Sequence, residues 1–408
     1  MKNIWESRFS ERLTLMKESP IRKLLKFTEM ADVISFAGGL PAPEVFPVDK
    51  FKSACEKTLS EKSAIALQYG TTGGYQPLRE WIAKNNKLGI EFSPDNLLIT
   101  TGSQQSLDLL GRVFINSGDS ILVESPTYLG ALQAWNAYQA HYLPVPIDSD
   151  GLIINEFEKG LQQSPKFAYI QPNFHNPAGV SLPLSRRLDI LALAERYGVP
   201  IIEDDPYGQL NYDCEPIDSL MLLDACKQNG APVYCGGVIY LGTFSKLLAP
   251  GMRMAYIIAP VEVINKINIA KQAADLHTAT FNQVVTYEII KDGFIDEHVQ
   301  LIRQVYRERR DILLAYLEKY MPPGTTWTHP KGGLFIWAFL PEDVDTTELL
   351  IYAEKQRVAF VPGIQFFPGD HEMKNAMRLN FSNTRPELIE TGLQRLAAAY
   401  HDYQADRH

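Results

Sequence analysis

Residues 184–207 read LSRRLDILALAERYGVPIIEDDPY, and this stretch decides the class of fold. Its first part, Leu184–Tyr197, has the pattern of an amphipathic helix, and Gly198 stands where a helix would end. Val199–Ile202 follows as an apolar, β-branched run that is typical of a buried strand. A helix that leads directly into a buried strand is the repeating unit of proteins in which crossover helices join parallel strands.

The same alternation extends in both directions, from about Asn96 to Ala259. The other apolar runs that we interpret as buried strands are Leu97–Thr100, Ser120–Val123, Phe167–Ile170, Val238–Leu241 and Met254–Ile258. After about Lys271 the pattern changes to long helical stretches, of which Glu297–Tyr320 is the clearest, and to short strands. The sequence therefore predicts an α/β fold with a mostly parallel central sheet and helices on both faces, plus a smaller α+β domain.

This interpretation divides the chain into three segments. We expect an N-terminal arm and small-domain segment over residues 1–45, a large domain over 46–275 and a C-terminal small domain over 276–408. Phe36–Pro43, which contains Gly39, is too rich in Gly and Pro for a regular element. We interpret it as a loop that returns to the small domain or lies over a cleft.

Composition and charge exclude several classes of function. The chain has 408 residues and a net charge of -9, without a cluster of Lys and Arg, so we expect no nucleic-acid partner. No apolar run reaches membrane-spanning length and the first residues are charged, so we expect no membrane contact and a cytoplasmic location. Four Cys without a CxxC pair and eight His without an HxxxH pattern predict neither a disulfide framework nor a metal site.

Candidate functional residues follow the predicted strands, at the edge where open α/β sheets bind their ligands. Lys246 comes shortly after one strand, close to the hydroxyls of Thr243 and Ser245 and seven residues before Arg253. Such a composition suits a lysine that forms an imine beside a phosphate group. A lone lysine is more often a solvated surface residue.

Acidic residues end a second strand, where Asp204 and Tyr207 lie three residues apart. An aspartate beneath a pyridine ring keeps the ring nitrogen protonated, so that the ring can accept electrons. The tyrosine hydroxyl can donate to an oxygen on the same ring. The alternative is structural, because acids at the end of a strand often cap the next helix.

Two further turns supply donors and a phosphate cup. Asn176 lies in an Asn-Pro-Ala-Gly turn after the strand Phe167–Ile170, and turns of this composition are common without a function. Gly102, Ser103 and Gln104 lie between a strand and the predicted helix Ser106–Phe114, whose free N–H groups and dipole favour an anion. An ordinary capped helix start is the alternative there.

Taken in order, these motifs resemble those of the fold type I pyridoxal-phosphate-dependent aminotransferases, from Gly38-Gly39-Leu40-Pro41 to Arg378-Leu379. Phe244-Ser245-Lys246 with the later Ala249-Pro250-Gly251 resembles the family's cofactor-lysine motif. The resemblance implies pyridoxal 5'-phosphate as cofactor, Lys246, Asp204 and Tyr207 as catalytic residues, and Tyr128 as the residue that stacks on the ring. The cofactor-binding residues that it implies are Tyr69, Gly102, Ser103, Gln104, Tyr128, Asn176, Asp204, Tyr207, Thr243, Ser245, Lys246 and Arg253.

The resemblance also implies substrate contacts and a partner. Arg378 matches the arginine that grips the substrate α-carboxylate, a task that suits a planar guanidinium, and Gly39 and Asn176 line the same site. Tyr69 matches a tyrosine that reaches the phosphate bound by a neighbouring subunit, which implies a homodimer. Ser19–Leu25 resembles the 2-aminoadipate aminotransferase group, and in that group Arg22 would pair with a distal carboxylate such as that of 2-oxoglutarate.

The implied activity moves an amino group from an L-amino acid to a 2-oxo acid. The donor stays open among 2-aminoadipate, glutamate, aromatic and branched-chain amino acids. Two alternatives remain on the same fold: a lyase or decarboxylase, and a non-catalytic sensor that binds the cofactor. A dinucleotide-binding protein is disfavoured, because no GxGxxG motif follows a strand.

Overall fold

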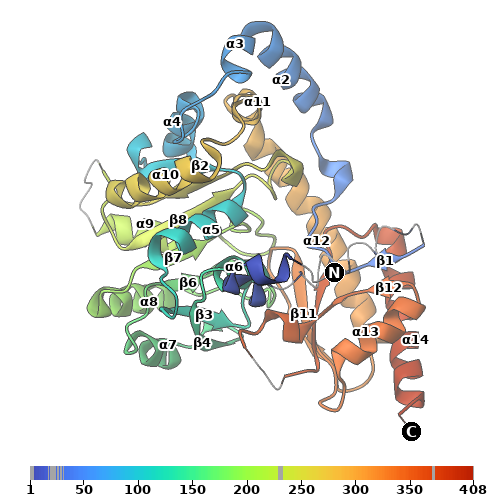
Figure 1. The fold of residues 1–408 in the computed structure, drawn as a ribbon. Coiled ribbons are helices and arrows are strands. Elements are labelled where there is room, and N and C mark those ends of the chain that lie inside the picture. The colour runs from blue at the N-terminus through green and yellow to red at the C-terminus, as the bar shows by residue number, and fades with distance from the viewer. Residues whose placement is uncertain are drawn as a thin grey trace.

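The computed structural model describes residues 4–16, 18, 24, 27, 30, 32–227, 233–369 and 373–407. Its largest element is a sheet of eight strands in the order β2-β9-β8-β7-β6-β3-β4-β5 (Figure 1). The strands are β2 (Leu97–Thr100), β3 (Ser120–Ser125), β4 (His141–Asp148), β5 (Gly151–Leu152), β6 (Ala168–Ile170), β7 (Ile201–Asp204), β8 (Val238–Thr243) and β9 (Ala255–Ile258). The central pairs from β4 through β8 are parallel.

One predicted strand has the opposite direction. β9 runs antiparallel to both β2 and β8. The connection from Thr243 to Ala255 holds only a turn and a short 3-10 helix, and a parallel strand needs a longer crossover. The sheet is therefore mostly parallel, as predicted, with antiparallel pairs towards its two ends.

Helices cover both faces of this sheet. They are α4 (Gln76–Asn85), α5 (Ser103–Phe114), α6 (Leu129–Asn136), α7 (Ile154–Leu161), α8 (Leu184–Tyr197), α9 (Leu220–Cys226) and α10 (Val261–Asp275). Neighbouring residues of one strand enter different cores, since Ile201 packs in one hydrophobic cluster and Ile202 in the other. Gly198 adopts the left-handed conformation at the end of α8, as the sequence predicts for a helix stop.

A second, smaller unit contains an antiparallel sheet with the order β10-β11-β14-β13, beside long helices (Figure 1). Its elements are α12 (Phe294–Tyr320), β10 (Thr326–Trp327), β11 (Phe335–Phe339), α13 (Thr346–Lys355), β12 (Val358–Ala359), β13 (Val361–Pro362), β14 (Ala376–Asn380) and α14 (Pro386–Ala405). Three more helices, α2 (Val48–Glu61), α3 (Ser63–Ala66) and α11 (Thr280–Ile290), lie together at the top of Figure 1.

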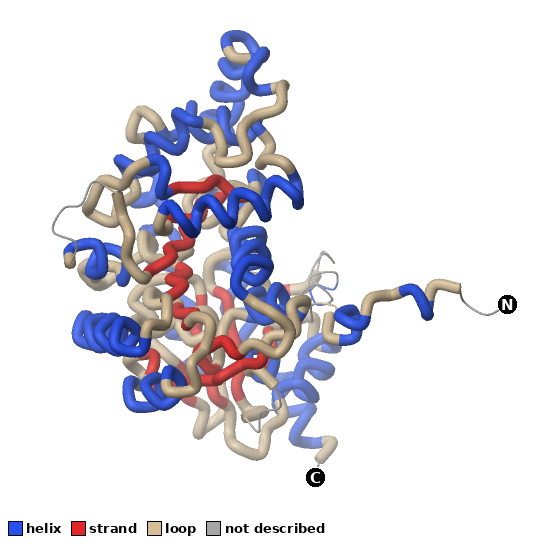
Figure 2. Tube along the Cα trace, turned by 60° about the vertical axis from the view of Figure 1, so that its left-hand side comes forward, coloured by secondary structure: helices blue, strands red, loops and turns tan. Residues whose placement is uncertain are grey.

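The N-terminal segment crosses between these units. β1 (Ile34–Ser35) pairs in parallel with β12, so this part of the N-terminal segment lies with the elements of the smaller unit. Residues 4–16 form two short 3-10 helices without a buried residue, and Figure 2 shows them projecting away from the body. We propose the boundaries near residues 45 and 275 as those of the large domain, with β1 belonging to the small one. Among the described residues, every helix is too short or too polar to cross a bilayer.

Candidate active site

A cavity of about 650 Å³ lies at the carboxyl ends of the parallel strands. Gln171 follows β6, Asp204 ends β7 and Thr243 ends β8, so the sheet supplies one wall. Phe335 and Arg378 come from the small sheet, and Gly39 from the N-terminal loop. The remaining lining residues are Leu40, Ser103, Gln104, Tyr128, Gln133, Asn176, Pro206, Tyr207, Ser245, Lys246, Pro250 and Arg253.

Lys246 projects into this cavity from the loop after β8. Its Nζ donates to the carbonyl oxygen of Gly39 at 2.8 Å. Removal from water lowers the pKa of Lys246 to about 8, and the positive charges of Arg378 and Arg253 act in the same direction. Near neutral pH a fraction of this amine is therefore unprotonated and can act as a nucleophile or a base.

Asp204 is buried with one oxygen engaged and the other without a partner. Its Oδ2 accepts from the Tyr169 hydroxyl at 2.6 Å and from Gln171 Nε2 at 3.3 Å. Its Oδ1 is buried and makes no hydrogen bond. Burial raises the pKa of Asp204 to about 6, while the donors Tyr169 and Gln171 lower it. A buried carboxylate oxygen without a donor is ready to accept from a protonated ring nitrogen.

Asn176 and Arg378 form a buried pair that also lines the cavity. Arg378 donates to Asn176 Oδ1 at 2.9 Å and to the carbonyl oxygen of Ala37 at 2.7 Å. Its guanidinium lies 4.2 Å from the centre of the Phe335 ring, which fixes its plane. Because the oxygen of Asn176 is engaged, its NH₂ group remains as a donor, and it interacts with the Tyr207 hydroxyl.

The start of α5 forms another wall. Gly102 is the residue before the helix, has a φ of 79° and gives no side-chain cap, so the first N–H groups of α5 stay available. A Cβ at Gly102 would overlap the guanidinium of Arg253, which therefore lies directly against the turn. Helix α5 begins at Ser103, earlier than the predicted Ser106, so that Ser103 and Gln104 lie in its first turn. The Thr243 hydroxyl donates to Ser245 Oγ at 3.0 Å nearby.

Two of the predicted residues that the structure describes, Tyr69 and Gly102, do not line the cavity. Tyr69 is 79% exposed and packs edge-on against His277, outside the cavity. Arg22 lies outside the described residues. Gly102 itself does not line the cavity, although Ser103 and Arg253 on either side of it do. Every other predicted site residue lines it.

Sequence reasoning missed several residues of the site. Gln171 and Tyr169 donate hydrogen bonds to Asp204 Oδ2, and Phe335 stacks on Arg378. Gln171 could have been found, since it follows a predicted strand as Asp204 does. Tyr169 lies within the apolar run of β6, where nothing in the sequence separates it from a core aromatic.

These residues fit pyridoxal phosphate on chemical grounds. The site offers a partly buried amine with a lowered pKa, a buried carboxylate oxygen without a donor, an amide donor and an uncapped helix start with an arginine beside it. Such a set matches an aldehyde, a ring nitrogen, a ring oxygen and a phosphate. Among the described residues, no group of three or more His, Cys, Asp or Glu could hold a metal ion.

The chain belongs to the aminotransferase class I and II family, whose sequence profile matches residues 37–396. It is similar to aromatic-amino-acid aminotransferase 1 of Thermococcus litoralis, with 46% identity over 96% of this chain and 94% of that one. It is also similar to 2-aminoadipate transaminase of Thermus thermophilus, with 40% identity over 97% of each chain. The crystal structure of α-aminoadipate aminotransferase from Thermus thermophilus, complexed with N-(5'-phosphopyridoxyl)-L-leucine, covers 98% of this chain and 99% of its own, with a TM-score of 0.90 and 39% identity.

The chain is therefore a pyridoxal-phosphate-dependent aminotransferase of fold type I, in the 2-aminoadipate-like group. Its substrates are amino acids and 2-oxo acids. The fold, the cofactor and the reaction class predicted from the motifs are confirmed by these relatives. These three relatives are aminotransferases, which favours transamination over the lyase and sensor alternatives.

Proposed function

We propose that the cavity around Lys246 is the active site, and that it transfers the amino group of an L-amino acid to a 2-oxo acid such as 2-oxoglutarate. One observation carries this proposal: Lys246, Arg378 and Asp204, whose Oδ1 is buried without a hydrogen-bond partner, all line a single cavity. Transamination needs a base, an electron sink and a carboxylate anchor close together, and these three residues provide a place for each.

We assign the cofactor-holding roles as follows. Bound pyridoxal phosphate supplies an aldehyde that reacts with amines and a pyridine ring that accepts electrons. Asp204 would accept from the ring nitrogen through Oδ1, and Asn176 and Tyr207 would donate to the ring oxygen. Tyr128 would stack on the ring. The residues that would hold the phosphate are Gly102, Ser103, Gln104, Thr243, Ser245 and Arg253, joined by Tyr69 of a second subunit.

Lys246 has two roles in this proposal. Its Nζ would hold the cofactor, and as a free amine Nζ would accept the proton from the substrate Cα and act afterwards as the acid that donates it. The lowered pKa of about 8 supports this role, because an ammonium with an ordinary pKa would hold its proton too tightly. The carbonyl of Gly39 accepts from Nζ and keeps the side chain inside the cavity.

Arg378 orients the substrate. Its fixed guanidinium binds the α-carboxylate, so that the Cα–H bond faces Lys246. Asn176 and Gly39 line the same space and contact the substrate. The names of the relatives support aromatic amino acids and 2-aminoadipate as donors, and we add glutamate and branched-chain amino acids. Arg22 is our candidate for the distal carboxylate of an acidic substrate.

We further propose that the active unit is a homodimer in the cytoplasm. The exposed Tyr69, and the exposed Trp5 and Phe9 on the projecting arm, which are 62% and 61% exposed, support a partner subunit. The cytoplasmic proposal rests on Cys55, Cys214, Cys226 and Cys235, which are free thiols.

The absorption spectrum of the purified protein tests the proposed activity. The visible band of the bound cofactor should shift when L-glutamate is added and return when 2-oxoglutarate follows. L-Phenylalanine and L-2-aminoadipate serve as further donors. Formation of ammonia or of carbon dioxide in place of a 2-oxo acid would contradict transamination.

A further inference from the structure

A buried lysine lies behind the phosphate-binding turn and outside the cavity. Lys271, on α10, has a side chain that is fully buried. Its Nζ donates to both oxygens of Asp275, at 2.7 and 2.8 Å, and to Gln105 Oε1 at 3.0 Å. A buried ammonium is costly unless it is paired and hydrogen-bonded, so this side chain is held firmly by its partners.

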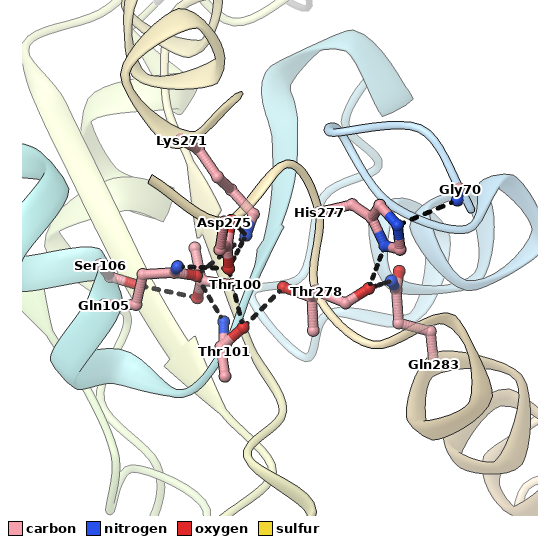
Figure 3. Close-up of polar contacts among 10 residues, drawn as sticks. All are labelled: Gly70, Thr100, Thr101, Gln105, Ser106, Lys271, Asp275, His277, Thr278 and Gln283. Carbon is pink, nitrogen blue, oxygen red and sulfur yellow. Dashed lines mark hydrogen bonds and ion pairs between the residues drawn. The ribbon is translucent and has the colours of Figure 1, made fainter. Parts of the chain in front are cut away.

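Asp275 connects this lysine to the turn before α5. Its Oδ2 accepts from Gln105 Nε2 at 2.6 Å and from the Thr101 hydroxyl at 3.3 Å. Gln105 in turn accepts the backbone N–H of Thr101 through Oε1 at 2.7 Å. Figure 3 shows these side chains converging on Asp275 from the turn and from α10.

The residues that are tied in this way flank the proposed phosphate cup. Asp275 contacts Thr101 and Gln105. Gly102, Ser103 and Gln104 lie between these two residues. Lys271 and Asp275 are absent from the cavity lining, whereas Ser103 and Gln104 are part of it. The pair therefore contacts the back of a turn whose front faces the cavity.

A second branch of the same network reaches the loop of Tyr69. The Thr101 hydroxyl lies 3.1 Å from the Thr278 hydroxyl, and His277 Nε2 accepts the backbone N–H of Gly70 at 3.2 Å (Figure 3). Tyr69 precedes Gly70 and packs on the His277 ring. Two segments that we assign to phosphate binding are thus joined through His277 and Thr278, which do not line the cavity.

We propose that the Lys271–Asp275 pair is a positioning device, which holds the turn Thr101–Gln105 in the conformation that receives the cofactor phosphate. The inference rests on the phosphate site proposed above. An anion bound by backbone N–H groups requires those groups to be aligned before it arrives, and a turn that must be ordered on binding gives a weaker site. Lys271 and Asp275 act through the turn and do not themselves contact the phosphate.

The test compares pyridoxal phosphate with pyridoxal, which has the same ring and aldehyde but no phosphate. The full-length protein is reconstituted with each compound and diluted, and the release rate is followed by absorbance. The variants are Asp275→Asn, which removes the charge, and Thr101→Val, which removes only the hydroxyl and is the milder change. Asp148→Asn is the matched control, since Asp148 also pairs with a cation, Arg186 at 2.7 Å, but its side chain bonds Arg186 and not the turn Thr101–Gln105.

We expect Asp275→Asn to release pyridoxal phosphate about tenfold faster than the wild type, and Thr101→Val about threefold faster, while release of pyridoxal changes less than about twofold. Asp148→Asn should match the wild type with both compounds. Equal acceleration of both compounds, or wild-type release of pyridoxal phosphate from both variants, would overturn the inference. A wild type that releases both compounds at the same rate would instead contradict the phosphate site itself, and the inference with it.

Discussion

Replacing Tyr169 by Phe should move the pH dependence of the reaction. The Tyr169 hydroxyl donates to Asp204 Oδ2 at 2.6 Å and lowers the pKa of Asp204, which burial nevertheless raises to about 6. A hydrogen bond to a charged group contributes about 1.5–3 kcal/mol, which corresponds to about one to two pKa units. Without the donor, the folded-state pKa of Asp204 should rise further, so that the carboxylate is partly protonated at pH 7.

The variant should therefore react with L-glutamate about tenfold more slowly at pH 7 and recover part of this loss as the pH rises. The assay is the pH profile of the single-turnover rate, followed by the visible absorbance of the cofactor. Tyr142→Phe is the matched control, because the Tyr142 hydroxyl donates to the Leu132 carbonyl oxygen and to Asn136 Oδ1, and not to Asp204. A Tyr169→Phe profile with the same acidic midpoint as the wild type would refute the reasoning.

Three further predictions follow from the same contacts. Arg378→Lys cannot form two parallel bonds to a carboxylate, so KM for amino acids should rise about 10- to 100-fold, and an unchanged KM in steady-state assays would exclude the assigned role. Gly102→Ala places a Cβ against Arg253 at a φ of 79° and should weaken pyridoxal phosphate binding about tenfold in titrations. Gly118→Ala is the control, because Gly118 has a φ of 85° but open space around it, and this variant should bind as the wild type does. Equal effects of the two substitutions would point to backbone strain alone. Burial raises the pKa of Glu124 to about 8, so the folded state loses stability as the pH rises towards and through that value. Glu124→Gln should remove about 2–5 kcal/mol of this loss between pH 5 and 9, measured as the free energy of unfolding in urea. Parallel curves of unfolding free energy against pH for the variant and the wild type would disprove this prediction.

Much of the fold could be predicted because buried parallel strands are short apolar runs. β4 was missed, since Pro144 and Pro146 argue against a strand. The structure accommodates both prolines because β4 pairs with β3 on one side, and with β5 only beyond them, at Ile147 and Asp148. The sequence does not reveal which edge of a strand lacks a partner.

The site could be predicted where a residue follows a strand, because parallel strands end at one edge. Residues that contact the site residues from outside the cavity could not be predicted, since their partners come from other elements. Tyr169 reaches Asp204 from the neighbouring strand β6. Lys271 and Asp275 have the spacing of an ordinary surface pair on a helix, and only the packing of α10 on α5 buries the lysine.

The most direct test of the central claim is to locate the bond between the protein and its cofactor. The wild-type protein with bound pyridoxal phosphate is reduced with borohydride, digested, and its peptides are identified by mass spectrometry. We predict that the phosphopyridoxyl group is found on Lys246, and that the Lys246→Ala variant carries none. Label on another lysine, or equal labelling of the variant, would contradict the assignment of Lys246 as the cofactor-binding residue.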